Sequence, residues 1–324
     1  MKAIKITNYG DASVLKLSES EPTPKPGPGQ VLVKVHAAGV NFVDIYQRKG
    51  IYPVGIPYIP GLEGAGIVEE VGAKVKGVRR GARVAYTGQL GSYAEYQAVD
   101  DWKLIPLPKR ISFEEGAAVP LQGMTAHYLI NDYRKLHKKD VVLIHAAAGG
   151  VGLLLVQWAK HLGAIVIGTV STEEKAQIAR KAGADHVIIY TKQDFVAETK
   201  RITEEHGVQL ILDGVGKTTF NGNLEVAAKY GHVVIFGASS GPADPITPNS
   251  LMPKSLTVSG GTLFNSAASR KDVARRSRDV LNGIAKRWLK LSISTVFPLG
   301  EAGKAHSLLE SRQSTGKIVL KIAG

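Results

Sequence analysis

The amino-acid sequence predicts an α/β protein in which a doubly wound parallel sheet is combined with a second, β-rich region. Residues 141–259 alternate between short apolar strand segments and helical segments. The preceding part of the chain shows short apolar runs separated by Gly and Pro turns. At 141–152, VVLIHAAAGGVG, an apolar run turns through small residues and glycines into a helical stretch. This is the pattern of a buried parallel strand that leads tightly into a helix.

The N-terminal region is expected to be rich in strands. Strands are predicted at 2–7, 30–38, 64–71 and 83–86. The Pro-rich run 21–29 is interpreted as a rigid connector inside this region, because strands flank it closely. A helix predicted at 119–130 leads out of it.

From about Val141 the pattern alternates regularly. Strands are expected at 141–145, 165–169, 186–189, 210–213, 232–236 and 256–259. Helices are expected at 150–161, 173–181, 195–206 and 219–229. Each of these helices is followed by a glycine that can act as a left-handed cap, namely Gly163, Gly183, Gly207 and Gly231. Six strands joined by crossover helices predict a doubly wound parallel sheet.

The C-terminal part is predicted to hold a long helix after Gly260, a strand at 292–297, a helix at 300–311 and a final strand at 317–322. This tail is too short to form a core of its own. We therefore expect it to pack back onto the N-terminal region.

Length and composition limit the class of protein. A chain of 324 residues is expected to form two domains. It contains no cysteine, which excludes disulfides, thiolate zinc sites and cysteine nucleophiles, and which suits a cytoplasmic protein. Neither an apolar run of about 18 residues nor an apolar signal core at the N-terminus is present, so no membrane association is expected.

The chain carries a formal net charge of +13, from 41 Lys and Arg and 28 Asp and Glu. Such a balance can attract phosphate-bearing partners or nucleic acid. Much of the excess lies in three short clusters at 134–139, 270–278 and 286–290. The last two fall on a predicted helix with one apolar face, which favours a solvated basic surface.

The glycine-rich turn predicts a nucleotide site. Backbone N–H groups at the start of a helix are unpaired and lie at its positive end, where a phosphate can bind. Residues 147–152 (AAGGVG) match the dinucleotide pattern G-x-G-x-x-G except for Ala147 in the first place. Gly149 can let a pyrophosphate approach the backbone, and Gly152 can let the helix pack close to the strand.

The end of the second strand favours NADP over NAD. An NAD site places an acidic residue there to hold the ribose 2′-hydroxyl. Here the first acidic residues, Glu173 and Glu174, already belong to the next helix, whereas Ser171 and Lys175 could bind a 2′-phosphate. Tyr190, at the end of the third strand, could add a hydroxyl. Lys175 could instead be an ordinary surface lysine, although the start of a helix disfavours a cation.

Several motifs together resemble a known family. They are GVN at 39–41, PGLEGAG at 60–66, VGAKV at 71–75, GARV at 81–84, QGMTA at 122–126, HAAAGGVG at 145–152, EKA at 174–176, GADHVI at 183–188 and GKIVL at 316–320. Over nearly its whole length the chain resembles the zinc-free quinone oxidoreductases, the ζ-crystallin-like branch of the medium-chain dehydrogenase/reductase superfamily.

The resemblance implies a GroES-like β-rich catalytic domain, residues 1–125 and 265–324, and a Rossmann NADP-binding domain, residues 126–264, with NADPH held between them. Zinc-dependent relatives carry Gly-His-Glu where this chain has Leu62 before Glu63, and they use cysteine ligands that this chain lacks. Since zinc needs three or four suitable ligands, no metal is expected. Glu63 is expected to remain as a structural, hydrogen-bonded carboxylate.

The resemblance also implies catalytic candidates. Asn41 resembles a family asparagine near the nicotinamide ribose and the substrate pocket, and Tyr46 and Tyr52 resemble pocket residues that could hydrogen-bond a quinone oxygen. Asp44 could orient its neighbours. The alternatives are a helix-surface carboxylate for Asp44 and ordinary core or loop positions for the two tyrosines.

Further residues are expected to contact the cofactor. Besides Asn41, Ser171, Lys175 and Tyr190, they are Gln122, Thr125, Gly149, Gly150, Val151, Gly152, Gly214, Phe236, Gly237, Leu263, Phe264 and Lys317. Those that follow strands lie where open α/β sheets bind ligands. Thr125 and Phe264 could instead serve packing alone, and Lys317 could lie on the surface. His145 is expected to be packed at the end of its strand.

The sequence therefore predicts a cytoplasmic enzyme that uses NADPH to reduce quinones without a metal. An acceptor reduced without a Lewis acid must already be electron-poor, so an alkenal or enone double-bond reductase is the alternative enzyme. An NADPH-binding protein associated with RNA, or a structural protein, is the alternative of another class. The resemblance implies a homodimer, for which the edge strand 256–259 is a candidate contact.

Overall fold

The computed structural model describes residues 1–322, which form two compact units. One unit comprises residues 1–124, 267–281 and the chain from 291 onward; the other comprises residues 125–266 and 282–290. The last two residues of the predicted segment 265–324 lie outside the described residues. Residues 282–290, which the prediction groups with the tail, pack within the second unit, where Trp288 contacts Trp158.

The second unit is built on a six-stranded sheet in the order β10-β9-β8-β11-β12-β13, and every pair in it is parallel. The strands are β8 Val141–Ile144, β9 Ile165–Val170, β10 His186–Ile189, β11 Val208–Asp213, β12 Ala227–Ile235 and β13 Thr257–Gly260. In sequence order this is 3-2-1-4-5-6, the Rossmann arrangement, with its switch point between β8 and β11. The predicted doubly wound sheet is confirmed.

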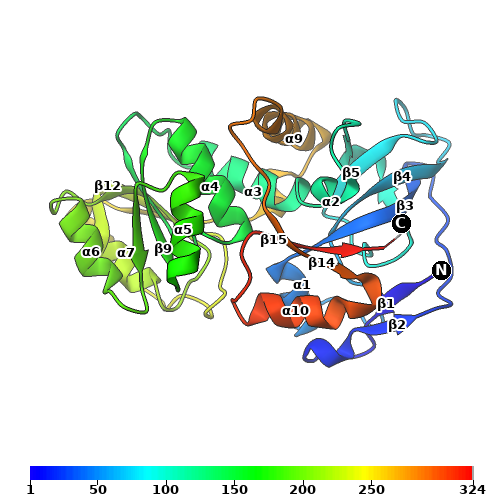
Figure 1. Ribbon diagram of the computed structural model, residues 1–324, viewed down its shortest axis with the longest axis horizontal. Coiled ribbons are helices and arrows are strands. Elements are labelled where there is room, and N and C mark those ends of the chain that lie inside the picture. The colour runs from blue at the N-terminus through cyan, green and yellow to red at the C-terminus, as the bar shows by residue number, and fades with distance from the viewer. Residues whose placement is uncertain (323–324) are drawn as a thin grey trace. The chain divides into compact units, whose positions relative to one another are not determined.

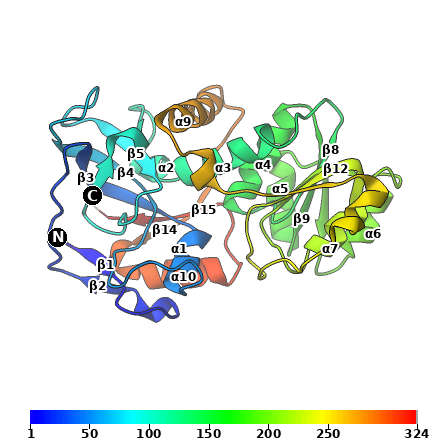
Figure 2. The same cartoon turned by 180° about the vertical axis from the view of Figure 1, so that it is seen from behind.

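Two pairs of helices accompany this sheet, and both can be followed in Figures 1 and 2. One pair is α4 Gly150–His161 with α5 Glu173–Ala182; the other is α6 Phe195–Ile202 with α7 Phe220–Val226. Because the strand order reverses at β8, right-handed crossovers place the pairs on opposite faces. On the α6–α7 side, buried residues of four strands form the core: Leu143, Ile167, Ile211 and Val233.

Three predicted details of this unit are wrong. The helix expected at 195–206 ends at Ile202, because Glu204 and Glu205 take left-handed backbone angles. The helix expected at 219–229 ends at Val226, because Ala227 already pairs with Val208 in the sheet. Gly163, Gly183 and Gly207 have the predicted positive φ, but in the fourth position Tyr230, with φ of 60°, takes the place predicted for Gly231.

The first unit contains a mixed sheet in the order β14-β15-β3-β4-β5-β7, with β6 paired to β3. Its strands are β3 Gln30–Val40, β4 Glu63–Val71, β5 Arg83–Thr87, β6 Tyr96–Asp100, β7 Leu104–Pro106, β14 Ile293–Pro298 and β15 Lys317–Lys321; β1 Ala3–Lys5 and β2 Lys16–Ser18 form a separate ribbon. The predicted return of the tail is confirmed, since β15 pairs with β3.

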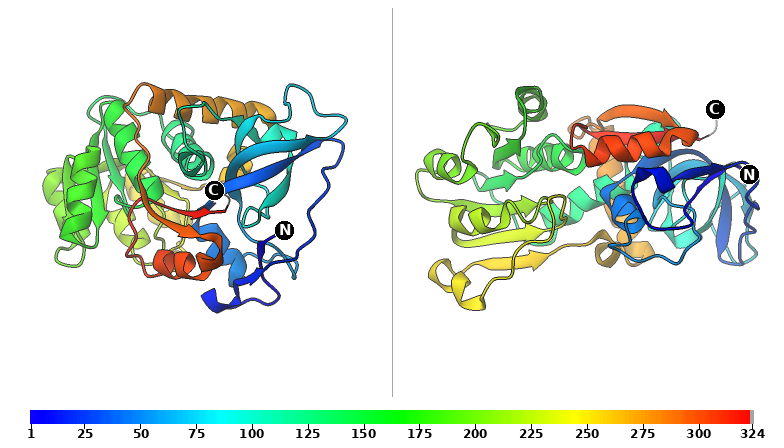
Figure 3. Two further views of the ribbon diagram at one scale, coloured as in Figure 1. Left: turned by 45° about the vertical axis from the view of Figure 1, so that its right-hand side comes forward. Right: turned by 90° about the horizontal axis from the view of Figure 1, so that it is seen from below.

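The helices that lie wholly within this unit are short, and two longer helices continue into the second unit. They are α1 Phe42–Arg48, α2 Phe113–Gly116 and α10 Ala302–Glu310, with α3 Pro120–Asn131 and α9 Arg270–Ala285 running on into the second unit. Figure 3 shows α10, in orange-red, beside the strands of the tail. The α10 residues Ala302 and Ala305 share a core with Ile4 and Ile318. In residues 1–322 no helix has the length and hydropathy of a membrane span.

Strand pairing in the first unit brings three distant parts of the chain to one place. The end of β3 lies beside the start of β4, since Ala38 pairs with Gly64, and beside the start of β15, since Val40 pairs with Ile318. Asn41, directly after β3, therefore lies next to the first residues of the other two strands, Glu63 and Lys317.

Candidate functional site

The glycine-rich turn has the backbone geometry that a phosphate requires. Ala146 takes a left-handed conformation, with φ of 51°, and Gly149 is the N-cap residue of α4. A Cβ atom at Gly152 would collide with the backbone of Ala146 and Ala147, so only glycine lets α4 begin this close to β8. The first turn of α4 holds no acidic residue, and its N–H groups have no partner within the helix. These features fit an anion.

The structure brings the predicted 2′-phosphate residues to neighbouring strand ends. β9 and β10 pair in register through Val170 and Ile189, so the following residues, Ser171 and Tyr190, occupy the same edge. The Tyr190 side chain is half-exposed. Lys175 lies in the first turn of α5, where partial burial lowers the pKa of its ammonium group.

The nearest carboxylates have other partners. Glu173 forms an ion pair with Arg180 at 2.8 Å. A hydrogen bond with the Thr172 side chain lowers the pKa of Glu174. The strand end thus offers hydroxyls and the ammonium group of Lys175, a donor set that suits a phosphate better than a ribose diol.

The ends of β11 and β12 form another part of this edge. A Cβ atom at Gly214 would contact the Phe236 ring, and one at Gly237 would contact the backbone of Gly214, so these three predicted residues lie together. After β13 the chain continues into α8, Leu263–Ser266, where Leu263 is buried and the Phe264 side chain is 48% exposed. That exposure excludes simple core packing for Phe264.

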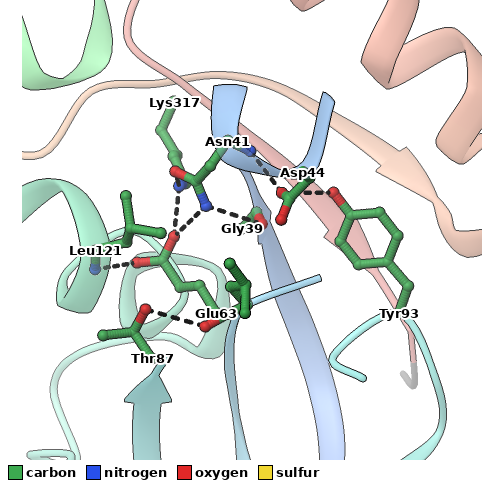
Figure 4. Close-up of polar contacts among 9 residues, drawn as sticks. Gly39, Asn41, Asp44, Glu63, Thr87, Tyr93, Leu121 and Lys317 are labelled. Carbon is green, nitrogen blue, oxygen red and sulfur yellow. Dashed lines mark hydrogen bonds and ion pairs between the residues drawn. The ribbon is translucent and has the colours of Figure 1, made fainter. Parts of the chain in front are cut away.

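In the first unit, Asn41, Glu63 and Lys317 form one buried polar cluster (Figure 4). The Lys317 Nζ atom lies 2.5 Å from Glu63 Oε2 and donates to Asn41 Oδ1 at 2.7 Å. The Asn41 amide donates to Glu63 Oε2 at 3.0 Å, and the Leu121 N–H donates to Glu63 Oε1 at 2.6 Å. Glu63 is hydrogen-bonded as predicted, and Lys317 is 1% exposed, which excludes a surface position.

Gly39 leaves the space that this cluster fills. A Cβ atom at this position would collide with the Glu63 carboxylate, the Lys317 side chain and the carbonyl of Ala117. The carbonyl of Gly39 also accepts a hydrogen bond from the Asn41 amide at 3.2 Å. The glycine of the GVN motif is therefore a steric requirement of the buried ion pair.

Asp44 is fully buried on the inner face of α1 rather than on the helix surface. Its Oδ2 atom accepts hydrogen bonds from the Asn41 backbone N–H at 2.9 Å and from the Tyr93 hydroxyl at 3.1 Å. Burial raises the pKa of Asp44 to about 7, although these two donors and the charge of Lys317 act in the opposite direction.

Tyr46 and Tyr52 belong to a different face. Their rings make an edge-to-face contact with centroids 5.2 Å apart. Residues two apart on a helix point to different sides, so Tyr46 is directed away from Asp44. The Tyr52 side chain is half-exposed. The four predicted catalytic residues thus divide into a buried pair, Asn41 and Asp44, and a more accessible tyrosine pair.

The remaining candidates lie on α3. Gln122 is half-buried and Thr125 is buried, and both follow Leu121, which donates to Glu63.

His145 is packed at the end of β8 as predicted, with hydrogen bonds to Thr169 at 2.9 Å and Asn223 at 2.7 Å. Among residues 1–322, no three His, Asp or Glu side chains are grouped so that they could hold a metal ion.

Comparison with known proteins agrees with this architecture. Residues 27–109 match the alcohol dehydrogenase GroES-like domain, and residues 150–278 match the zinc-binding dehydrogenase domain. The chain is 41% identical to a quinone oxidoreductase of Pseudomonas aeruginosa, over 98% of this chain and 99% of the relative. The chain belongs to the quinone oxidoreductase family of the medium-chain dehydrogenase/reductase superfamily.

Two further relatives show the range of this family. A 2-haloacrylate reductase of a Burkholderia species is 40% identical over 90% of each chain. The crystal structure of Escherichia coli quinone oxidoreductase complexed with NADPH is 38% identical, covers 99% of this chain and 100% of its own, and superposes with a TM-score of 0.96. The Rossmann and GroES-like architecture expected of a quinone oxidoreductase family member is thereby confirmed.

Several residues around Asp44 escaped the sequence prediction. Tyr93, Arg48 and His306 are completely buried and hydrogen-bonded to one another or to Asp44. Nothing in their spacing indicates this, because they come from three separate segments. A histidine among the alanines and leucines of 302–309 is the one sequence signal that could have drawn attention to the group.

The buried ion pair predicts a large loss of stability for Lys317→Met. Removing the ammonium group leaves the Glu63 carboxylate buried without its counter-ion, which typically costs about 3–5 kcal/mol of unfolding free energy. Lys321→Met, at an exposed position of the same strand, should change it by no more than about 0.5 kcal/mol. Denaturant titration of both variants measures the difference. Equal losses would contradict a structural role for the pair.

The raised pKa of Asp44 predicts a pH-dependent stability. Because the folded protein holds this proton up to about pH 7 and the unfolded chain releases it near 3.8, the stabilisation is complete below pH 3.8 and is lost as pH rises through 7. Relative to Asp44→Asn, which keeps an acceptor, the wild type should lose about 2 kcal/mol between pH 5 and pH 7. Denaturant titrations at several pH values test this. A pH-independent difference would contradict it.

Proposed function

We propose that this chain is an enzyme that uses NADPH to reduce quinones without a metal ion. The observation that carries the proposal is the phosphate-binding edge of the Rossmann unit, where the glycine turn is joined by Ser171, Lys175 and Tyr190 rather than by a carboxylate. Support comes from relatives described as quinone oxidoreductases. Two similar solved structures, of Escherichia coli quinone oxidoreductase and of a mycobacterial protein, are described as complexed with NADPH.

We assign cofactor binding to residues of both units, taking each unit in turn. Gly149 lets the pyrophosphate approach the backbone, the N–H groups of Gly150, Val151 and Gly152 bind it, and Ser171, Lys175 and Tyr190 bind the 2′-phosphate. Gly214, Phe236, Gly237, Leu263 and Phe264 line the cofactor at the carboxyl ends of the later strands. In the first unit, Asn41, Gln122 and Lys317, and in the second Thr125, complete the set.

Bound NADPH supplies the hydride, so the side chains only position and polarise the acceptor. Asn41 is held rigidly by Glu63 and Lys317 and can orient a neighbouring group. Tyr46 and Tyr52 present hydroxyls that can donate to the oxygen on which negative charge develops. An acceptor that needs no Lewis acid must be electron-poor, which a quinone is.

A conjugated alkene is the second candidate acceptor. It is favoured by one specific observation, the 40% identity to a 2-haloacrylate reductase, whose substrate carries a double bond next to a carboxylate. The same donors would then stabilise an enolate instead of a quinol oxygen. An RNA-associated or structural role, a homodimer formed through the edge strand β13 and a cytoplasmic location remain predictions from the sequence.

The acceptor is identified by a direct comparison. We expect rapid NADPH oxidation with benzoquinones and naphthoquinones and a lower kcat/KM with an enone of similar size. Oxidation of NADPH is followed by absorbance, and reactions without protein correct for spontaneous transfer to the quinone. Activity confined to enones would replace the first acceptor class by the second, and no turnover with either would refute the enzymatic proposal.

The 2′-phosphate assignment is tested by Lys175→Ala. Loss of a charge-assisted hydrogen bond should raise the KM for NADPH about tenfold and leave the KM for NADH nearly unchanged. Lys181→Ala, an exposed position in the last turn of the same helix, is the matched control and should alter neither value. If Lys175→Ala weakened both cofactors equally, its ammonium group would not bind the 2′-phosphate.

A further inference from the structure

A continuous chain of buried hydrogen bonds runs behind Asp44. The Tyr93 hydroxyl lies 3.1 Å from Asp44 Oδ2 and 3.1 Å from His306 Nε2, and Arg48 Nη1 lies 3.3 Å from His306 Nδ1. All four side chains are completely buried. The chain joins α1, which carries Asp44 and Arg48, to α10, which carries His306, and to the segment just before β6.

The direction of every hydrogen bond in this chain is determined. Arg48 can only donate, so His306 Nδ1 accepts and the ring proton resides on Nε2. Burial and the neighbouring guanidinium lower the pKa of His306 to about 3, which keeps the ring neutral. His306 Nε2 therefore donates to the Tyr93 oxygen, and the Tyr93 hydroxyl is left to donate to Asp44. Since arginine does not release its proton, the chain fixes positions rather than conducting protons.

At the other end of this series of hydrogen bonds, Arg48 has two further partners in the first unit. Arg48 also donates to the carbonyl of Gly10 at 3.1 Å and forms an ion pair with Glu310 at 2.7 Å. Glu310 pairs in turn with the exposed Lys49. The near end is the Asp44 Oδ2 atom, which accepts from the backbone N–H of Asn41 at 2.9 Å.

We propose that Tyr93 and His306 are positioning residues that hold Asp44, and through it the Asn41 backbone, in the geometry required for reduction of the acceptor. This inference rests on the role that the proposed function gives to Asn41. The Asn41 side chain is fixed separately by Glu63 and Lys317. One network therefore constrains the Asn41 backbone and the other constrains its side chain. Small displacements of a positioning group can cost as much as 10²-fold in rate.

Tyr93→Phe is the decisive variant, because it removes one hydroxyl and keeps the ring that packs edge-to-face on His306. Tyr86→Phe is the matched control: Tyr86 is equally buried in the same unit, and its hydroxyl donates to Gln97 at 2.6 Å. We expect Tyr93→Phe to lower kcat roughly tenfold with little change in the KM for NADPH. Tyr93→Phe and Tyr86→Phe should lower the Tm by similar amounts, but Tyr86→Phe should not lower kcat.

Variants of His306 extend the test. In His306→Gln the amide can accept from Arg48 and donate to Tyr93, so it should retain most of the kcat that His306→Leu loses. Equal losses in the two His306 variants, or equal kcat values in Tyr93→Phe and Tyr86→Phe, would overturn the positioning role.

A measurement without turnover separates this inference from the proposed function. Hydrogen exchange followed by mass spectrometry should show faster exchange in the segment 39–46 in Tyr93→Phe but not in Tyr86→Phe. Should the wild type reduce no acceptor, the proposed function fails while the exchange result still decides whether Tyr93 holds this segment. Unchanged exchange in Tyr93→Phe overturns the inference in either case.

Discussion

The ion pair between Glu63 and Lys317 is the interaction on which the arrangement of the first unit's polar cluster depends. It joins the first residues of two strands, β4 and β15, that are 254 positions apart, and both strands flank β3. A buried ion pair contributes little net stability compared with apolar packing, but it strongly penalises any arrangement that separates the charges. Its effect here is to select one geometry for Asn41. The Asn41 Oδ1 atom must face the ammonium and its amide N–H must face the carboxylate, so the side chain has a single orientation.

In the Rossmann unit a buried carboxylate also fixes the orientation of its neighbours, but through hydrogen bonds alone and without a cation. Asp213, at the end of β11, accepts hydrogen bonds from the N–H groups of Val215 and Gly216 and from the side chains of Thr219 and Asn223. Because the Asn223 amide donates to Asp213, its oxygen is free to accept from His145 Nε2. Burial lowers the pKa of His145 and favours this neutral ring. The loops on both sides of the switch point are thereby tied together at the edge that is assigned to the cofactor.

The sequence predicts local structure and chemistry much better than it predicts spatial neighbours. The six parallel strands, the glycine turn and the placement of Ser171 and Tyr190 follow from periodicity and from the rule that parallel strands end at one edge. One error arises where non-local pairing decides, at Ala227, which pairs with Val208 in the sheet instead of continuing the helix. Another arises from the left-handed backbone of Glu204 and Glu205, which ends a helix early. The Asn41–Glu63–Lys317 cluster required knowledge of which strands flank β3, and the Tyr93–His306 contact required the packing of α10 against α1. Neither the strand order nor the helix packing can be predicted from composition and spacing.

Burial separates the functional residues into two kinds. Asn41, Asp44, Glu63 and Lys317 are at most 4% exposed, and the hydrogen bonds of Asn41, Glu63 and Lys317 are directed at one another, so they are suited to holding a shape. Tyr52 is half-exposed and Tyr46 half-buried, with hydroxyls on accessible side chains. A group that stabilises charge on a diffusible acceptor must be reachable by that acceptor, whereas a group that fixes geometry gains from exclusion of water. We therefore propose that the tyrosine pair contacts the acceptor and that Asp44 acts through Asn41 rather than on the acceptor itself.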